Sequence, residues 1–433
     1  MGTTGNSNIG GYRWGASMSR MPTGLGLGYR QSNIANLGVK WETQEQVNVG
    51  IDLGFFHERV NLIVDWYKKV SKDMLMSLQL PSYMGTSGNA SSALAAPMGN
   101  YGDIENKGWE ISLNTHPLIG AFEWDSDFQI SFNRNKLRAL DGTANAQIVG
   151  YGQWSDVVSV TNVGESLYNF YGYVCDGVYE DLEDLQTSAK PAKYPADGVF
   201  NRTNTVWVGD IKYKDLNGDG VIDENDRTNI GSPLPKFTFG WTNTFRYKNF
   251  DLSLFINGSY GNKVFNYLGM KLTHMNSPWS NQLNTVLDRA QIVPIDPNKD
   301  YSAGVVVNGV TIYNWYDDIT NVRVANAGAT IPRASIQDPN DNDRISDRYI
   351  EDGSYIRLKN ITLGYTFPGK IIKKWGLDNL RVYANIQNLL TITGYSGYDS
   401  EIGASTASAN VYGLDNGRYP SPTVYSFGLN VSF

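Results

Sequence analysis

The chain has 433 residues with a formal net charge of −7, and it is rich in aromatic residues (12%) but poor in charged ones (18%). No run of about 20 apolar residues occurs, which excludes a bundle of membrane-spanning helices. The acidic balance, without any basic stripe, excludes nucleic acid as a partner. The single cysteine, Cys175, excludes an internal disulfide.

Alternation of apolar and polar residues is the dominant pattern of the chain, and it predicts β-strands. In residues 47–55 the apolar side chains fall on odd positions, with polar residues or glycine between them. Residues 122–133 place aromatic and aliphatic residues on one face and Glu, Asp, Gln, Ser and Asn on the other. Similar alternation is found in residues 60–67, 109–114, 237–241, 250–257, 361–367, 380–387 and 425–433.

These segments favour a membrane barrel over a soluble sheet. Soluble strands average about 5–6 residues, whereas about 9–11 tilted residues cross a bilayer, and the alternating segments fit the longer value. Tight turns at residues 55–59 and 246–249 contrast with long, Asn- and Gly-rich connections that are predicted to be loops. We predict an all-β fold, an antiparallel transmembrane β-barrel portion with about 10–11 strands. Its lumen-facing carboxylates are predicted to form a polar wall and not catalytic pairs; they are Asp65, Glu110, Glu123, Asp125 and Asp127.

The most specific local motif lies in residues 215–226. Oxygen-bearing side chains stand at positions 1, 3, 5, 9 and 12 of this segment, with Gly220 at position 6, which is the spacing of an EF-hand-type calcium loop. Carboxylates this close in sequence repel one another unless a cation lies among them. Ile222 is expected to anchor the loop to a core. The predicted Ca²⁺ ligands are Asp215, Asn217, Asp219, the backbone carbonyl of Val221, Asp223 and Asp226.

Two features keep an alternative open, namely a solvated Asp/Gly turn without metal. Position 12 is Asp226 where EF-hands have Glu, and the preceding residues 211–214 look extended where EF-hands have a helix. We favour calcium in a structural role. No catalytic residues are predicted, because no Ser/His/Asp set, phosphate-binding Gly loop or zinc spacing is found.

Longer motifs resemble a known family. Residues 209–226, followed by residues 230–235 and 250–255, are similar to the SusC/RagA family of TonB-dependent outer-membrane transporters of Bacteroidetes. The resemblance extends from about residue 38 to the terminal Phe433, which ends an alternating aromatic strand. Further similar segments, in the order of the family, are residues 40–42, 64–67, 106–110, 170–173, 346–355 and 385–389.

The resemblance implies a larger barrel of about 22 strands with an N-terminal plug domain, and a SusD-like lipoprotein over its outer opening. We interpret residues 1–433 as the C-terminal part of the barrel domain, without plug domain or signal peptide. Contact with the TonB complex would come from the missing N-terminal part. The implied location is the outer membrane, in contact with its lipid. The implied function is TonB-dependent import of nutrients, with oligosaccharides as the favoured ligand and peptides as the other; no enzymatic activity is implied.

Two other functional classes stay open. One is a passive porin-like or structural barrel, and the other is a secreted, calcium-stabilised β-rich glycan-binding module. Aromatic loop residues suit sugar stacking and loop packing equally, so they do not decide the matter. They are Tyr151, Trp154, Tyr168, Tyr171, Tyr173 and Tyr179. The sequence does not identify the ligand, its contacts or the oligomeric state.

Overall fold

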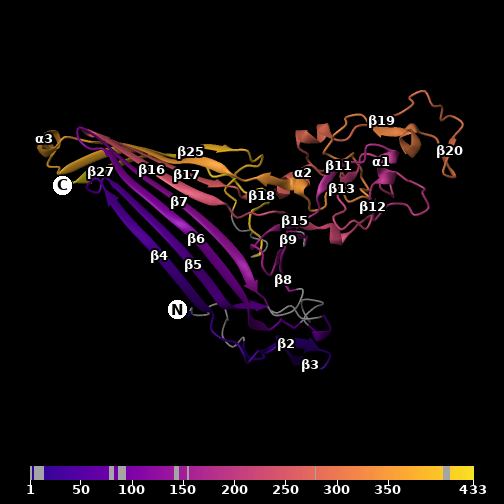
Figure 1. Ribbon diagram of the computed structural model, residues 1–433, viewed down its shortest axis with the longest axis horizontal. Coiled ribbons are helices and arrows are strands. Elements are labelled where there is room, and N and C mark those ends of the chain that lie inside the picture. Colours follow the sequence, from indigo (N-terminus) through magenta and orange to yellow (C-terminus); the bar gives the residue numbers. More distant parts are fainter. Residues whose placement is uncertain are drawn as a thin grey trace.

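The computed structural model describes residues 2–3, 14–77, 82–85, 94–140, 146–153, 156–277, 279–402 and 410–433. They form a broad sheet of long strands with a second, irregular part at one end (Figure 1). This second part, here called the loop unit, comprises the described residues of 146–235, 261–354 and 394–423. Trp154, one of the aromatic loop residues, lies outside the described residues.

The sheet has ten strands, and every neighbouring pair is antiparallel. The predicted antiparallel arrangement and strand number are confirmed. Within the described chain the sheet is open, with β1 and β27 at its two edges. Its strands are, in order, β1 (Gly2–Thr3), β4 (Thr43–Phe55), β5 (Val60–Ser77), β6 (Met98–Leu118), β7 (Phe122–Ala139), β16 (Phe237–Tyr247), β17 (Phe250–Tyr260), β24 (Tyr355–Thr366), β25 (Asn379–Thr393) and β27 (Val424–Ser432).

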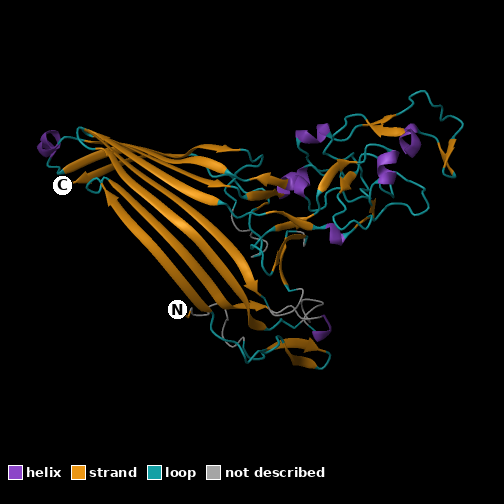
Figure 2. Cartoon of the chain, in the orientation of Figure 1, coloured by secondary structure: helices purple, strands orange, loops and turns teal. Residues whose placement is uncertain are grey.

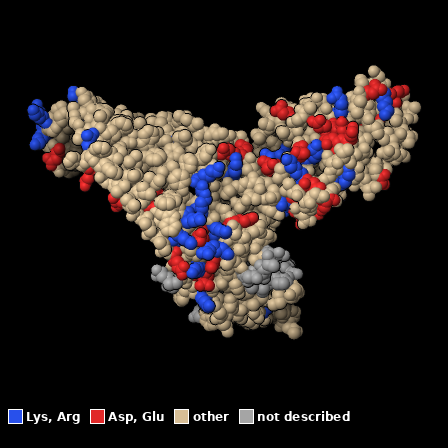
Figure 3. All heavy atoms as spheres, viewed as in Figure 1, with Lys and Arg blue, Asp and Glu red and all other residues tan. Residues whose placement is uncertain are grey.

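One face of the sheet is apolar along its middle. Leu53, Leu62, Leu113, Phe128 and Trp241 lie in register across five adjacent strands. Figure 3 shows this face, whose surface carries few charged residues between the two ends of the sheet. The period-two alternation of the sequence therefore produces one continuous apolar surface.

Aromatic rows border this apolar face. Near the loop unit, five aromatic residues lie in neighbouring positions on five adjacent strands, and we call them the loop-side girdle: Trp66, Trp109, Phe132, Phe237 and Tyr260. Toward the turns, the ring pairs Phe122–Tyr247 and Phe250–Tyr365 have centroid distances of 6.4 and 4.7 Å. Such rows mark the two interfaces of a membrane-spanning barrel.

The opposite face is polar, and its charges are paired across strands. Asp125 contacts Arg246 (Oδ2–Nη1, 2.5 Å) and His116 (Oδ1–Nδ1, 2.6 Å). Arg381 pairs with Asp251 at 2.5 Å. Of the five carboxylates for which the sequence predicted a polar wall, Asp125 and Glu123 take part in such pairs, with Glu123 Oε2 at 3.6 Å from Arg246 Nη1.

The predicted tight turns are found between β4 and β5 and between β16 and β17. Three successive residues in the first turn, from Phe56 to Glu58, have φ between 55° and 65°. Lys248 in the second turn has φ 53°. Such left-handed residues fit the twist of two-residue and short hairpins. All the short connections lie at the end of the sheet away from the loop unit (Figure 1).

The loop unit is not an assembly of irregular loops, so the expectation of plain loops was wrong in this respect. It contains small sheets and short helices (Figure 2). Its sheets pair β8 (Gln147–Tyr151), β9 (Val157–Asn162), β10 (Phe170–Gly172) and β15 (Thr228–Gly231); β11 (Cys175–Val178) and β13 (Ile211–Tyr213); β12 (Lys190–Pro191) and β14 (Val221–Ile222); β18 (Lys263–Asn266), β23 (Ile350–Asp352) and β26 (Leu414–Asp415); β19 (Ile292–Pro294) and β22 (Val322–Val324); and β20 (Val305–Val307) and β21 (Val310–Ile312).

The helices of the described chain are short, and none of them is long and apolar enough to span a membrane. They are α1 (Leu182–Thr187), α2 (Tyr267–Leu272), α3 (Gly369–Ile372), and the 3₁₀ helices η2 (Ser82–Met84), η3 (Glu224–Asp226), η4 (Asn284–Asp288), η5 (Trp315–Asp317), η6 (Ile319–Asn321), η7 (Asp347–Tyr349) and η8 (Lys373–Trp375). A separate hairpin joins β2 (Met18–Thr23) to β3 (Gly26–Gln31).

Two main hydrophobic cores explain why the long connections fold. The first is built around the fully buried Trp207 and includes Val208, Ile211 and Val322. The second is built around Phe170, Phe265, Tyr267 and Tyr349, residues from three separate segments of the chain. Each core consists of apolar residues from segments that are distant in the sequence. No local periodicity therefore predicts these cores.

Candidate functional site

The predicted calcium loop lies in the loop unit, between β13 and β15. The preceding residues Ile211–Tyr213 form a strand, as their extended appearance suggested. Ile222 is 2% exposed and belongs to the core around Trp207. The predicted role of Ile222 as the anchor of the loop is therefore confirmed.

Side-chain oxygens in the first half of the loop point back at its own backbone. Asp215 accepts from the N–H groups of Gly218 (2.6 Å) and Gly220 (2.8 Å). Asn217 accepts from Asp219 N–H at 2.9 Å, and Asp219 accepts from Val221 N–H at 2.9 Å. Gly220 has φ +81°, a conformation that glycine adopts without strain.

The end of the loop is closed by Asp226, which is fully buried. Its carboxylate accepts from Leu216 N–H (2.8 Å) and from Asp223 N–H (2.9 Å), so it joins the two ends of the loop. Next to the predicted ligand carbonyl of Val221, the Gly220 carbonyl accepts from Lys190 N–H in the pairing of β12 with β14. The short Asp at position 12 thus ties the loop together, which is a structural task that does not require a long side chain.

A cluster that the sequence did not predict brings His274 together with Asp338 and Asp343. Their potential ligand atoms all lie within 4.8 Å of one another, which no other trio of His, Cys, Asp or Glu achieves in the described part of the chain. His274 Nδ1 lies 3.0 Å from Asp343 Oδ2. The four carboxylates of the predicted calcium loop do not form such a group there, and calcium binding stays a prediction.

Burial and pairing shift the pKa values in this cluster. The hydrogen bond to Asp343 raises the pKa of His274 above its ordinary value. Burial raises the pKa of Asp338 to about 6. Burial also acts on Asp343, but the hydrogen bond and the charge of His274 prevail and lower the pKa of this carboxyl.

We expect the loop unit to lose stability as the pH rises above about 6.5, the ordinary pKa of His. A His with a raised folded-state pKa contributes fully below its unfolded pKa, and this contribution is lost as the pH rises through the folded pKa. Asp338, whose pKa is also raised, acts in the same direction near pH 6. The melting temperature of the loop unit, measured between pH 6 and 8, should fall, and His274→Gln should flatten the curve.

The matched control is His57→Asn in the turn between β4 and β5, because Asn tolerates the φ of 58° at this position. This variant should keep the pH dependence. A His274→Gln protein with the same pH dependence as the unsubstituted protein would show that the cluster does not control stability.

A buried ion pair lies beside this cluster. Arg333 Nε is 2.7 Å from Asp210 Oδ1, and these two side chains are 5% and 0% exposed. Asp210 also accepts from Trp207 N–H at 2.8 Å and from Asn342 Nδ2 at 3.2 Å. Asn342 in turn donates to Asp338, at 2.5 Å, so it connects the buried pair to the His274 cluster.

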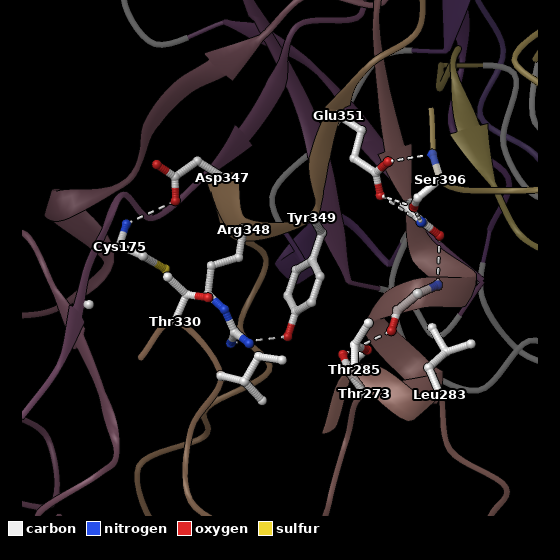
Figure 4. A pocket seen from close by; sticks show the side chains of 14 residues that line it. Cys175, Thr273, Leu283, Thr285, Thr330, Asp347, Arg348, Tyr349, Glu351 and Ser396 are labelled. Atoms are coloured by element: carbon white, nitrogen blue, oxygen red, sulfur yellow. Dashed lines mark hydrogen bonds between the residues drawn. The ribbon is translucent and has the colours of Figure 1, made fainter. Parts of the chain in front are cut away.

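A cavity of about 520 Å³ opens in the loop unit, and four of the residues that line it belong to the 346–355 motif, namely Asp347, Arg348, Tyr349 and Glu351 (Figure 4). On one side, Asp347 Oδ1 accepts from Cys175 N–H at 2.9 Å, and Arg348 donates to the Tyr349 hydroxyl at 3.3 Å. On the other side, Glu351 accepts from Ser396, at 2.7 Å from its Oγ and 2.8 Å from its N–H. Acidic, basic and hydroxyl side chains thus line the same cavity.

The cavity is suited to binding polar molecules. Burial raises the pKa of the Cys175 thiol to about 12, which keeps it neutral and unreactive at physiological pH. The Glu351 carboxylate is held by Ser396 and by Asn266 Nδ2 at 2.8 Å. These partners position the carboxylate, so it can accept hydrogen bonds from a ligand in a fixed geometry.

Comparisons with known proteins place this architecture. No family model matches the chain. TonB-dependent receptor P3 of Formosa agariphila is 32% identical over 444 residues, which cover 100% of this chain and 38% of that protein. TonB-dependent receptor SusC of Bacteroides thetaiotaomicron is 27% identical over 402 residues, covering 92% of this chain and 32% of SusC. The chain therefore spans less than two fifths of the length of these relatives.

The solved structure of the RagAB peptide transporter has the same fold, with a TM-score of 0.68 at 21% identity over 100% of this chain and 40% of that one. The sheet with its apolar face, aromatic rows and terminal loop unit therefore has the β-barrel fold of that transporter. In sequence the chain is similar to TonB-dependent receptors, SusC among them, which agrees with the resemblance of its motifs to the SusC/RagA family.

The sequence indicated the 215–226 loop, for which calcium binding stays a prediction, but gave no indication of the His274 cluster, the buried ion pair or the cavity. The 346–355 motif, four residues of which line the cavity, was used only for the resemblance. For the cluster there was no local signal, because His274 and Asp343 are far apart in the chain. Both are brought together by the packing around α2 and the segment before η7.

Proposed function

We propose that the chain forms part of the wall and outer loops of an outer-membrane importer that takes up nutrients with energy supplied through TonB. The observation that carries this proposal is a sheet with one apolar and one charged face and a packed loop unit at one end only. An apolar sheet face of this size is stable against lipid, and a charged lumen lets hydrophilic solutes pass. Relatives that are TonB-dependent receptors support the energy source.

Uptake of a labelled ligand by cells provides the test. Deleting TonB should abolish uptake while the amount of protein in the outer-membrane fraction stays unchanged. Uptake that persists without TonB would favour the porin-like alternative. A protein that is folded and monodisperse without detergent would refute the membrane location and favour a secreted binding module.

We further propose a SusD-like lipoprotein as the partner at the outer opening and oligosaccharides as the ligand. Hydroxyl-rich ligands suit the cavity, which offers the polar side chains of Asn266, Glu351 and Ser396 for hydrogen bonds. Peptides are the second candidate, because the fold also occurs in the RagAB peptide transporter. Competition of unlabelled oligosaccharides and unlabelled peptides in the same uptake assay distinguishes the two.

The third proposal is a structural Ca²⁺ bound by residues 215–226. The fit rests on the donor set, the left-handed Gly220 and the anchored Ile222, which are features of an EF-hand-type loop. The ion would bind the carboxylates at positions 1, 5 and 9 and hold the loop against the core. It would take no part in transport chemistry.

Calcium should raise the melting temperature of the loop unit, and EDTA should lower it. Binding to the folded state alone stabilises it by about 2.7 kcal/mol at a free calcium concentration 100 times Kd. Asp219→Asn keeps an oxygen for the Val221 N–H but removes the charge, so the calcium response should largely disappear. Asp300→Asn, an exposed carboxylate elsewhere in the loop unit, is the matched control and should respond normally. Equal melting temperatures in calcium and EDTA would refute the site.

A further inference from the structure

A row of basic residues lies just beyond the loop-side girdle, on the apolar face of the sheet. Lys68, Lys107 and Arg134 are in register across β5, β6 and β7, each two residues beyond a girdle residue. Arg134 also donates to the backbone carbonyl of Lys236 at 3.0 Å, so it lies beside the start of β16. We call Lys68, Lys107 and Arg134 the basic row.

The charge of the basic row is compensated at only one member. Lys68 Nζ lies 3.3 Å from Glu105 Oε2, but this carboxylate is shared with Arg138. Among the described residues, no carboxylate lies within 4.0 Å of the charged nitrogens of Lys107 and Arg134. Like charges on directly opposite residues destabilise a sheet. The row is therefore suited to an anion that comes from outside the chain.

The position of the row indicates the kind of anion. In Figure 3, Lys and Arg gather in a column that crosses the sheet near the loop unit, while the neighbouring apolar face is nearly free of charge. Aromatic girdles lie where hydrocarbon meets the head groups of a membrane. Two residues along a strand correspond to about 7 Å, so the basic row lies at the level of the head groups.

We propose that the basic row binds the phosphate groups of anionic lipids in the outer leaflet around the barrel. This inference rests on the proposed membrane location but not on the transported ligand. A phosphorylated lipid matches both parts of the surface, because its chains cover the apolar face and its phosphate reaches the edge of that face. Arg134 can form paired hydrogen bonds to phosphate, and Lys68 and Lys107 act as point charges.

The test uses the complete barrel protein purified in detergent and titrated with lipid A, dephosphorylated lipid A or inorganic phosphate, with bound lipid measured by native mass spectrometry. The triple variant Lys68→Gln, Lys107→Gln, Arg134→Gln should bind lipid A about 100-fold more weakly at low salt, since each basic residue near an anionic lipid surface contributes a factor of about five. Binding of dephosphorylated lipid A should be weak and equal in both proteins.

The matched control removes three lysines at the opposite end of the sheet, Lys370, Lys373 and Lys374 in α3 and η8. This variant has the same change in charge and should bind lipid A normally. If the first triple variant does not fold, Lys107→Gln alone should still show a loss of about fivefold.

Three results would overturn the proposal. One is wild-type affinity of the first triple variant, and another is an equal loss in the control variant. The third is displacement of lipid A by equimolar inorganic phosphate, which would indicate a site for soluble anions. Nutrient uptake by the same variants is measured in parallel. Because uptake does not depend on whether the basic row binds lipid A, a failure of the lipid proposal is distinguishable from a failure of the proposed transport function.

Discussion

Replacing Arg333 by Met should destabilise the loop unit by about 3–5 kcal/mol, the cost of leaving one partner of a buried ion pair without the other. Asp210 is fully buried, and its other partners, Trp207 N–H and Asn342, supply hydrogen bonds without charge. Burial already raises the pKa of the Asp210 carboxyl, and Arg333 opposes this shift. Hydrogen exchange of the loop-unit amides in the complete barrel should show the loss as faster exchange around Trp207.

Charge and packing can be separated by a second variant. Adding Asp210→Asn to Arg333→Met removes the unpaired charge, so the double variant should recover part of the stability. Lower pH should also help the single variant, because a carboxyl with a raised folded-state pKa loses stability as the pH rises through that value. Arg202→Gln is the control, since its pair with Asp317 is 38% and 40% exposed and should contribute less than about 1 kcal/mol. A single variant no less stable than this control would refute the argument.

Leu113→Arg should destabilise the folded barrel by about 2–4 kcal/mol, the cost of a cationic side chain on the lipid face near the middle of the bilayer. Leu113 lies between Leu62 and Phe128 in the central row of the apolar face. Equilibrium unfolding by guanidinium in lipid vesicles would measure the change.

The neighbouring substitution Ser112→Arg provides a control on the same strand. Ser112 points to the opposite face, opposite Gln129 and Ile63 in register, where an added charge meets the polar lumen. It should cost much less than Leu113→Arg. An equal loss in the free energy of unfolding for the two variants would contradict the assignment of the two faces. A larger loss for Ser112→Arg would mean that the lipid face and the lumen face have to be exchanged.

The sheet could be predicted from the sequence because the alternation of apolar and polar residues that determines it lies within each strand. Alternation in residues 122–133 alone defines which side chains of β7 face lipid, and pairing with β6 and β16 follows from chain order. The same logic worked for Ile222, since a single apolar residue in an acidic loop has few reasons to be there other than burial. Family resemblance added the class of transporter, which no strand pattern specifies.

The loop unit could not be predicted because its determinants are non-local. Asp210 and Arg333 are separated by 123 residues, and their pairing depends on the packing of both segments around Trp207. Strand ends were missed for a different reason. The alternating pattern in residues 109–114 covers only part of β6, which has 21 residues, because residues 98 to 108 lie beyond the girdle residue Trp109, where no apolar face is required.

Because of this extra length, one part of each long strand lies in lipid and the rest extends into water. On β6 the girdle residue Trp109 is followed, toward the loop unit, by residues 108 to 98, about 35 Å of strand. On β17 the girdle residue Tyr260 is the last of the strand. The rim is therefore high along β5, β6 and β7 and low along β17, and the loop unit lies over the low side (Figure 1). Above the membrane the high rim is held by surface ion pairs such as Lys72–Glu45, the chemistry of a water-soluble sheet continued on a membrane strand.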